Sequence, residues 1–175
     1  MIKACVMDAD AMRRALRRMA HELLERGPGA EDLVLAGIPR RGVDLAERLC
    51  AIIRSIEGRE VPCLELEIEP YRDDRSGGAH LPQRGELLAA QKRVCIVDDV
   101  LFTGRTARAA LDAVIHHGRP SKVELLVLVD RGHRELPIRA DYVGKNVPTA
   151  SQESVSVHVV ERDGVDEVLI EGETI

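Results

Sequence analysis

Short apolar runs alternate with longer segments of helical period along most of this chain. Three runs have the length of buried strands: residues 33–36, 94–97 and 123–129. Three longer segments follow the helical period: Asp8 or Asp10 to about Arg26, residues 43–56 and residues 107–114. This alternation predicts an α/β fold, with a mainly parallel, twisted sheet flanked by helices. In such a fold the functional site lies beyond the carboxyl ends of the strands.

Two further patterns have the period of exposed strands. Leu64, Leu66 and Ile68 alternate with glutamates, which predicts a half-exposed strand at an edge or in a hairpin. Residues 155–159 also alternate, and Asp163-Gly164 leads into residues 167–170, which predicts a C-terminal β-hairpin. Residues 71–86 are polar and have no period, so we expect a long mobile loop that forms a hood over the site.

Composition and charge narrow the class of protein. At 175 residues, with 45% hydrophobic but only 2% aromatic residues, the chain fits one domain over residues 1–175 with an aliphatic core. A net charge of −5 argues against a generally basic nucleic-acid binder, although a local basic patch stays possible. The cysteines form no CxxC pair, which argues against a zinc site. No segment has the apolar length of a signal peptide or a membrane span, so we expect a cytoplasmic protein without a membrane partner.

The most informative chemistry follows the strand at 94–97. Asp98 and Asp99 come directly after it, and the turn Thr103–Thr106 precedes a helix. The first helical turn has unpaired backbone N–H groups, which together with the helix dipole form an anion site. Gly104 allows close approach of the backbone, and the carboxylates can accept hydrogen bonds from two vicinal hydroxyls. This arrangement suits a phosphorylated sugar, whereas a simple helix cap needs only one acid.

The run from Val94 to Thr106 resembles the phosphoribosyl-pyrophosphate (PRPP) signature of the type I phosphoribosyltransferases. The turn Ile38–Gly42 also follows a strand and precedes a helix, so it should open on the same edge of the sheet. In isolation it is an ordinary arginine-rich turn, but the resemblance implies that Arg40 and Arg41 hold pyrophosphate. It also implies that the loop containing Tyr71–Asp74 and Arg84 closes over PRPP and excludes water.

Longer segments resemble one branch of this superfamily. The stretches Arg13–Glu22, Tyr71–Asp74 and especially Val129–Thr149 are similar to the PyrR family of pyrimidine operon regulators with uracil phosphoribosyltransferase activity. The chain departs from the family pattern in a shorter loop after Asp74 and in Arg40, where members commonly carry a hydroxyl residue. The resemblance implies conversion of uracil and PRPP to UMP and diphosphate. Mg²⁺ would arrive with PRPP rather than be fixed by protein side chains.

The resemblance also assigns roles to individual residues. Asp98, Asp99 and Arg41 would be catalytic, and whether Asp99 acts as a general base stays open. The residues implied to bind PRPP or nucleotide are Arg40, Arg41, Asp98, Asp99, Val100, Leu101, Phe102, Thr103, Gly104, Arg105, Thr106, Arg131 and Val155.

A basic surface is predicted on the first helix. Met12, Leu16, Met19 and Leu23 define its buried face, so basic residues gather on the opposite face: Arg14, Arg17, Arg18 and His21. Such a face alone is usually solvated surface. The PyrR resemblance implies that these residues, with Arg134, Arg139 and Lys145, bind the pyr mRNA leader. UMP or UTP would strengthen that binding.

Two alternative functions remain open at this point. One is a salvage phosphoribosyltransferase for a purine base or uracil without an RNA role, which competition among uracil, hypoxanthine and guanine would decide. The other is a regulator that keeps the PRPP residues only to sense nucleotide. The resemblance implies a homodimer or homotetramer. The sequence does not distinguish transcription attenuation from translational control.

Overall fold

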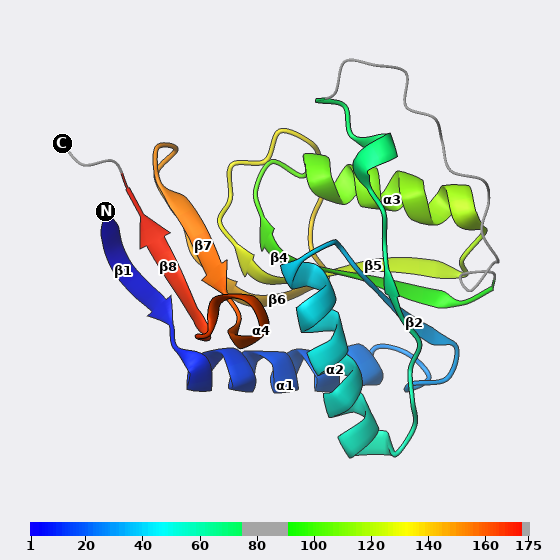
Figure 1. The fold of residues 1–175 in the computed structure, drawn as a ribbon. Helices are drawn as coiled ribbons and strands as arrows, with labels where there is room; N and C mark the ends of the chain where they lie inside the picture. Colours follow the sequence, from blue (N-terminus) through cyan, green and yellow to red (C-terminus); the bar gives the residue numbers. More distant parts are fainter. Residues whose placement is uncertain (75–90, 173–175) are drawn as a thin grey trace.

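The computed structural model describes residues 1–74 and 91–172 and contains two sheets (Figure 1). A five-stranded parallel sheet has the order β3-β2-β4-β5-β6. Its strands are β2 (Leu33–Gly37), β3 (Cys63–Glu65), β4 (Arg93–Leu101), β5 (Lys122–Asp130) and β6 (Tyr142–Asn146). A three-stranded antiparallel sheet has the order β1-β8-β7 and joins both ends of the chain. Its strands are β1 (Ile2–Met7), β7 (Ser154–His158) and β8 (Glu167–Glu171).

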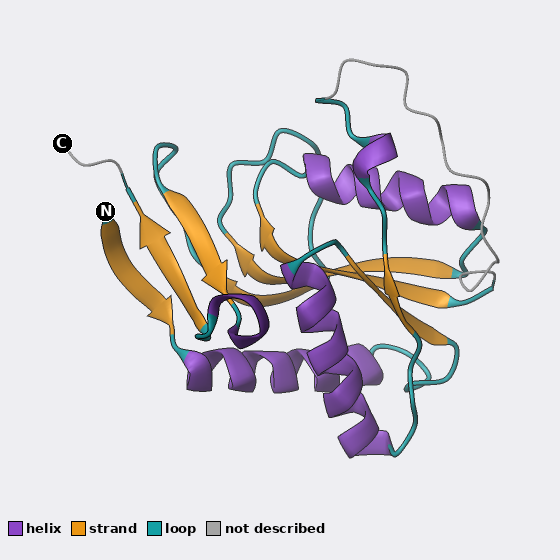
Figure 2. Ribbon diagram, in the orientation of Figure 1, coloured by secondary structure: helices purple, strands orange, loops and turns teal. Residues whose placement is uncertain are grey.

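Helices cover both faces of the parallel sheet (Figure 2). The helices are α1 (Ala9–Glu25), α2 (Arg41–Glu57), α3 (Arg105–His117) and the short α4 (Val160–Asp163), and Glu69–Tyr71 forms a 3-10 turn. Side chains alternate along β4: Cys95 and Val97 pack in the cluster with α1 and α2, whereas Ile96 packs in the cluster with α3. The buried face of α3 consists of four alanines and Val114, so this helix can lie close to the sheet.

Most predicted elements are present close to their expected bounds. Asp8 caps α1, because its Oδ1 accepts a hydrogen bond of 2.8 Å from the Ala11 N–H. Gly58 ends α2 in the left-handed conformation, at φ 68°. The predicted C-terminal hairpin is the β7–β8 pair, although its connection includes α4.

Two expectations about the strands were wrong, and two strands were not predicted. The two acids do not follow β4, because this strand continues through them to Leu101. Strand β1 was missed because most of it is exposed at a sheet edge, and β6 because it is short and includes Gly144. The strand expected at 64–69 ends at Glu65. Leu66 and Ile68 are nevertheless buried. The alternation of apolar and acidic residues in this segment therefore arises from burial of the apolar side chains and not from strand pairing.

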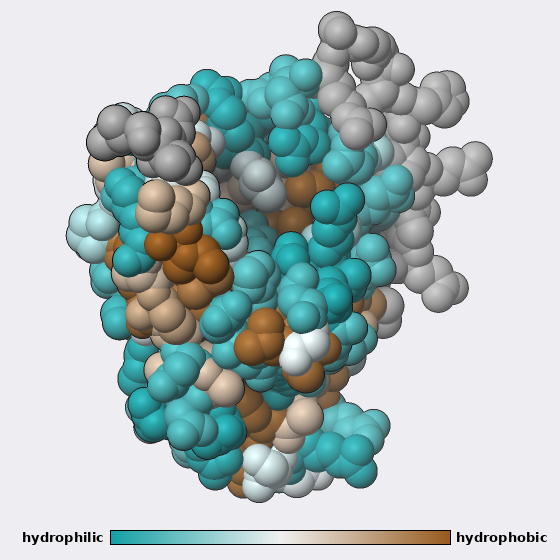
Figure 3. All heavy atoms as spheres, turned by 60° about the vertical axis from the view of Figure 1, so that its left-hand side comes forward, coloured by the Kyte–Doolittle hydropathy of each residue, from teal (hydrophilic) through white to brown (hydrophobic). Residues whose placement is uncertain are grey.

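The expected hood loop lies largely outside the described residues, as does Arg84. Its described beginning includes Tyr71, which packs against α3 with its ring centroid 5.7 Å from that of His116. Among the described residues, no helix is both long and apolar enough to cross a membrane. On the face shown in Figure 3, apolar patches are separated by polar side chains.

A buried polar network lies at the start of β4. Arg93 Nε donates to Glu124 Oε2 at 2.5 Å, and Arg93 Nη2 donates to the Leu23 carbonyl at 2.8 Å. The Tyr142 hydroxyl donates to Glu124 Oε1 at 2.8 Å. This network joins α1, β4, β5 and β6 at the edge of the sheet opposite the carboxyl ends of the strands.

Candidate active site

The carboxyl ends of four parallel strands meet at one edge of the sheet. Gly37 of β2 pairs with Val97 of β4, and Leu101 of β4 pairs with Asp130 of β5, which in turn pairs with Asn146 of β6. The loops that follow these strands therefore open beside one another, as expected for a ligand site in a parallel sheet.

Asp98 and Asp99 form an acid pair inside β4 rather than in the loop after it. As successive strand residues they point to opposite faces, and both are half-buried. Asp98 Oδ1 accepts the Asp99 N–H at 2.9 Å, and Asp99 Oδ1 accepts the Val100 N–H at 2.8 Å. Burial and the neighbouring charge of Asp99 raise the pKa of Asp98 well above its usual value. The site therefore resists a second negative charge until a ligand supplies hydrogen bonds.

The predicted phosphate loop is present at the start of α3. Gly104 adopts φ 93°, and a Cβ on it would lie 3.3 Å from Cβ of Ile138. Thr103 Oγ1 accepts the Arg105 N–H at 3.3 Å, while its carbonyl accepts N–H groups of Glu135 and Leu136 at 2.9 and 3.2 Å. The segment after β5 thus contacts this loop through backbone hydrogen bonds. The first turn of α3 has N–H groups without acceptors inside the helix, which are suited to bind an anion.

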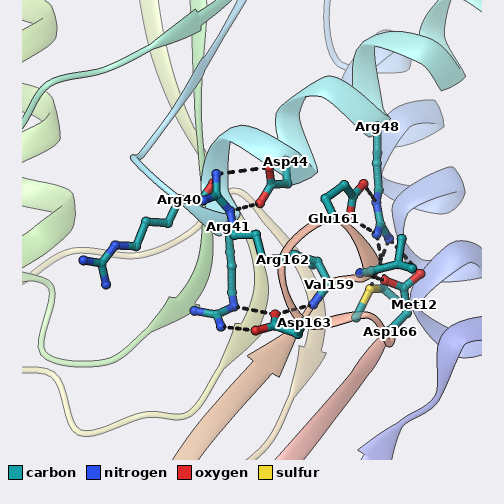
Figure 4. Close-up of polar contacts among 11 residues, drawn as sticks. Met12, Arg40, Arg41, Asp44, Arg48, Val159, Glu161, Arg162, Asp163 and Asp166 are labelled. Atoms are coloured by element: carbon teal, nitrogen blue, oxygen red, sulfur yellow. Dashed lines mark hydrogen bonds and ion pairs between the residues drawn. The ribbon is translucent and has the colours of Figure 1, made fainter.

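The predicted pyrophosphate loop connects β2 to α2 and presents its two arginines differently. Arg41 Nη2 and Nε donate to the Asp163 carboxylate at 2.8 and 3.2 Å. Arg40 is exposed, and Figure 4 shows its side chain pointing away from this ion pair. Within the described part of the chain, the Arg40 guanidinium has no hydrogen-bond partner. Arg40 is therefore the readier of the two predicted residues to meet an anion.

The pyrophosphate loop lies directly against the acid pair. The Ile38 N–H donates to the Val97 carbonyl at 2.9 Å. A Cβ on Gly42 would lie 2.6 Å from the same carbonyl oxygen and 3.5 Å from Cα of Asp98. Only glycine permits this approach, so Gly42 brings the loop and Asp98 together.

Arg131 and Phe102 form a stacked pair beyond the ends of β4 and β5. The Arg131 guanidinium lies 4.0 Å from the centroid of the Phe102 ring. Arg131 Nε also donates to Thr149 Oγ1 at 3.0 Å, and its Nη2 donates to the Glu153 carbonyl at 2.6 Å. Burial lowers the pKa of Arg131. The predicted residue Arg131 thus fixes the chain that enters β7.

A cavity of about 390 Å³ lies beside this stacked pair, at the ends of β5 and β6. Its lining residues are Asp130, Arg131, Gly132, His133, Arg134, Asn146, Pro148 and Thr149. Only Arg131 was predicted to bind ligand here. Asn146 was missed together with β6, and recognition of a final parallel strand after β5 would have indicated it.

The remaining predicted ligand residues lie in varied surroundings. Leu101 is buried, and Val100 and Val155 are half-buried against the main core, so their contribution to a ligand site would come from the backbone. Thr106 is half-buried in the first turn of α3. Arg105 pairs with Glu135 at 2.8 Å and with Asp73 at 2.6 Å. Arg105 thereby anchors the start of the hood loop to the phosphate loop.

The predicted basic face of α1 divides into free and engaged residues. Arg14, Arg17 and His21 are exposed, and their side chains form no hydrogen bonds with other described residues. Arg18 instead donates to Glu22 at 2.7 Å and to the Gly144 carbonyl at 2.6 Å. Arg18 therefore attaches α1 to the exposed edge strand β6.

The three basic residues predicted outside α1 also differ. The Arg134 guanidinium donates to the Phe102 carbonyl at 2.7 Å, to the Ile138 carbonyl at 2.9 Å and to Asp130 Oδ2 at 2.5 Å, so it supports the active-site loop. Lys145 is exposed, and its Nζ donates to the Val6 carbonyl at 2.8 Å. Arg139 is exposed.

Comparisons with known proteins agree with this geometry. Residues 6–162 match the family model described as the phosphoribosyl transferase domain. The chain is 58% identical over 170 residues to the bifunctional protein PyrR of Deinococcus deserti, covering 95% of this chain and 93% of the relative. It is 56% identical over 172 residues to the bifunctional protein PyrR of Pelotomaculum thermopropionicum, covering 96% and 95%.

A solved structure supports the fold. Hypoxanthine phosphoribosyltransferase from Trypanosoma cruzi, in complex with the product IMP, aligns with a TM-score of 0.74 at 17% identity, covering 98% of this chain and 91% of that one. These findings confirm the type I phosphoribosyltransferase fold predicted from the sequence. The chain belongs to the phosphoribosyltransferase family and, within it, to the family of bifunctional PyrR proteins.

Proposed function

We propose that this chain transfers a phosphoribosyl group from PRPP to uracil, giving UMP and diphosphate. In addition, it regulates the pyr operon by uridine-nucleotide-dependent binding of pyr mRNA. One observation carries the enzymatic half: two anion-binding loops and an acid pair meet at one sheet edge, beside a cavity that can hold a base. The membership in the bifunctional PyrR family supports both halves.

The acid pair and the two loops divide the work on PRPP. The phosphate loop, Thr103–Thr106, holds the 5′-phosphate through backbone N–H groups and hydroxyls. Asp98 and Asp99 accept hydrogen bonds from the ribose hydroxyls. Their charge also stabilises the positive charge that develops on the sugar as its bond to diphosphate breaks. Arg40 and the N–H groups at the start of α2 hold the departing diphosphate.

Mg²⁺ fits this site as an ion carried by PRPP. Mg²⁺ is commonly bound by one or two carboxylates together with substrate phosphates and water. Asp98 and Asp99 provide such oxygens, and the described residues contain no larger cluster of metal-binding side chains. When bound, the ion neutralises negative charge on the diphosphate.

Uracil occupies the cavity beyond β5 and β6. The Phe102–Arg131 stack forms one side of this region, and Asp130 and Asn146 offer polar groups at the two strand ends. An attacking ring nitrogen would approach the anomeric carbon from this side, opposite the diphosphate. As the bond from this nitrogen to the anomeric carbon forms and the bond to diphosphate breaks, the nitrogen loses its proton, and Asp99 is the candidate base that accepts it.

RNA binding is assigned to the exposed basic face of α1, with Arg14, Arg17 and His21 as its free cations. This face provides a local positive surface on a chain with a net charge of −5. Lys145 extends it from β6, whereas Arg18 and Arg134 act through the internal contacts described above. Arg139 lies apart from this face, beside Ala107 and Leu111 of α3. A bound nucleotide strengthens RNA binding only if RNA favours the nucleotide-bound state.

Two assays test the proposal. Competition among uracil, hypoxanthine and guanine with PRPP should give UMP as the main product, and a purine nucleotide as the main product would contradict uracil selectivity. Binding of pyr leader RNA should be tightened by UMP and weakened by salt. An active enzyme with no RNA binding at any UMP concentration would favour the alternative, a salvage enzyme without regulation.

A further inference from the structure

Helix α4, in the connection between β7 and β8, is attached to α2 by a set of ion pairs (Figure 4). Arg41, Asp44 and Arg48 lie on one face of α2, because they are three and four residues apart. Their partners follow one another on and after α4: Arg41 pairs with Asp163, Asp44 with Arg162, and Arg48 with both Glu161 and Asp166. We call these residues the α2–α4 clasp.

Arg162 differs from the other members of the clasp because it also contacts the pyrophosphate loop. Its Nη2 donates to the Arg40 carbonyl at 3.3 Å and to Asp44 Oδ1 at 3.2 Å. The same carbonyl accepts the Val43 N–H at 3.1 Å and the Asp44 N–H at 3.3 Å. Asp44 is buried, with 7% of its surface exposed, so its carboxylate holds the Arg162 guanidinium in a fixed position. The direction of the Arg40 carbonyl is therefore determined by groups on both α2 and α4.

The conformation of Arg40 explains why its carbonyl needs such support. Arg40 has φ 74° and ψ −120°, a combination that residues other than glycine rarely adopt. Turning over the Arg40–Arg41 peptide would change ψ of Arg40 by half a turn, to about 60°, which lies in the left-handed region. The same rotation would move φ of Arg41 out of its helical value, so the two orientations differ by opposing terms. The hydrogen bonds at the carbonyl oppose this rotation. Loss of the hydrogen bond from Arg162 would increase the population of the turned-over peptide.

The same peptide carries a candidate ligand of the diphosphate. Arg41 is the first residue of α2, so its N–H has no acceptor within the helix. In a trans peptide the N–H points opposite to the C=O. While the Arg40 carbonyl points toward Arg162, the Arg41 N–H points away from it. Turning the peptide over would remove this donor from the loop.

We propose that Arg162 is a positioning residue for the pyrophosphate site, acting through the Arg40–Arg41 peptide and not by touching substrate. The inference rests on the proposed phosphoribosyltransferase function. Helix α4 lies far from the PRPP signature in the sequence. It nevertheless belongs to the active site, because it supports the orientation of a loop that binds diphosphate.

The test compares Arg162→Gln with Arg48→Gln, which removes ion pairs of the same clasp without reaching the Arg40 carbonyl. The full-length variants are titrated with inorganic pyrophosphate plus Mg²⁺, and separately with UMP, by calorimetry. We expect Arg162→Gln to weaken pyrophosphate binding about tenfold or more, the effect of losing a charge-assisted hydrogen bond. UMP lacks the diphosphate, so its affinity should change by less than about twofold. Arg162→Lys, which keeps the charge but not the two-pronged geometry, should fall in between.

Three results would overturn the proposal: unchanged pyrophosphate affinity in Arg162→Gln, equal losses in Arg162→Gln and Arg48→Gln, or equal losses of pyrophosphate and UMP affinity. The last two would show a general loss of structure, which melting temperatures of both variants would also reveal. Failure of the proposed function is separate, because it would be seen as a wild-type protein that forms no nucleotide from PRPP.

Discussion

Substitution of Gly42 by alanine should impair PRPP use by displacing the pyrophosphate loop. The new Cβ would lie 2.6 Å from the Val97 carbonyl oxygen, whereas ordinary contacts begin at 3.4 Å. To restore an ordinary contact distance of 3.4 Å, the start of α2 would have to move about 0.8 Å away from β4. Both contacting groups are backbone, so no side chain can rotate away.

A shift of this size has consequences for both activity and stability. Misplacement of catalytic groups by about 1 Å can cost on the order of 100-fold in rate. We therefore expect kcat/KM for PRPP to fall roughly 30- to 100-fold at saturating uracil. Overpacking of this kind costs about 1–3 kcal/mol, which lowers Tm by roughly 2–12 °C in a chain of this length.

The assay is steady-state formation of UMP with PRPP as the varied substrate, alongside thermal unfolding. Ile53→Val is the control, because Ile53 is buried on the same helix and its truncation costs about 0.5–1.5 kcal/mol without a clash near the loop. This control should lose stability and keep its KM for PRPP. If Gly42→Ala shows a lower Tm but a kcat/KM within threefold of wild type, the close approach of loop and strand is not required for catalysis.

Three further outcomes are expected. The pKa of Asp98 is higher in the folded than in the unfolded protein, so ionisation of Asp98 destabilises the fold as the pH rises above the unfolded pKa. Asp98→Asn should therefore raise Tm near pH 8 and leave Tm unchanged near pH 3, where Asp98 is protonated in both states. The same substitution should abolish phosphoribosyl transfer. Burial favours the neutral form of Glu124, but hydrogen bonds from Arg93 and Tyr142 hold its pKa below the usual value. The contribution of this network to the free energy of unfolding should therefore be present at neutral pH and be lost as acid protonates Glu124. Arg93→Leu removes the arginine partner of this buried carboxylate and leaves it only Tyr142 and Lys122. The substitution should cost about 1.5–3 kcal/mol, or roughly 3–12 °C in Tm by calorimetry at pH 7. Alanine at Arg14 or Arg17 should each flatten the slope of log K against log[salt] for leader RNA by roughly 0.7–0.9, and an unchanged slope would exclude that residue from the contact.

The sequence predicted the parallel sheet and phosphate loop because both depend on local signals. Val94–Val97 is an uninterrupted apolar run, and Gly104 marks the turn before α3. Contacts between distant segments were not predictable in this way. The pairing of Arg41 with Asp163 joins positions 122 residues apart, and neither side chain differs in pattern from an ordinary exposed charge. The same limit applies to β6, whose place at the sheet edge is set by β5 and α1 rather than by its own residues.

The placement of β1 beside β8 has a consequence for how the chain folds. The Met1 ammonium group donates to the Gly172 carbonyl at 2.8 Å, across 171 positions of sequence. During synthesis β1 therefore remains without its partner strand until β8 has left the ribosome. Contacts between such distant segments form slowly, because a long loop must close before they bring any stabilisation. Helix α4 directly precedes β8, so we expect the parallel sheet to form first and the pyrophosphate loop to reach its final shape only when the last strand docks.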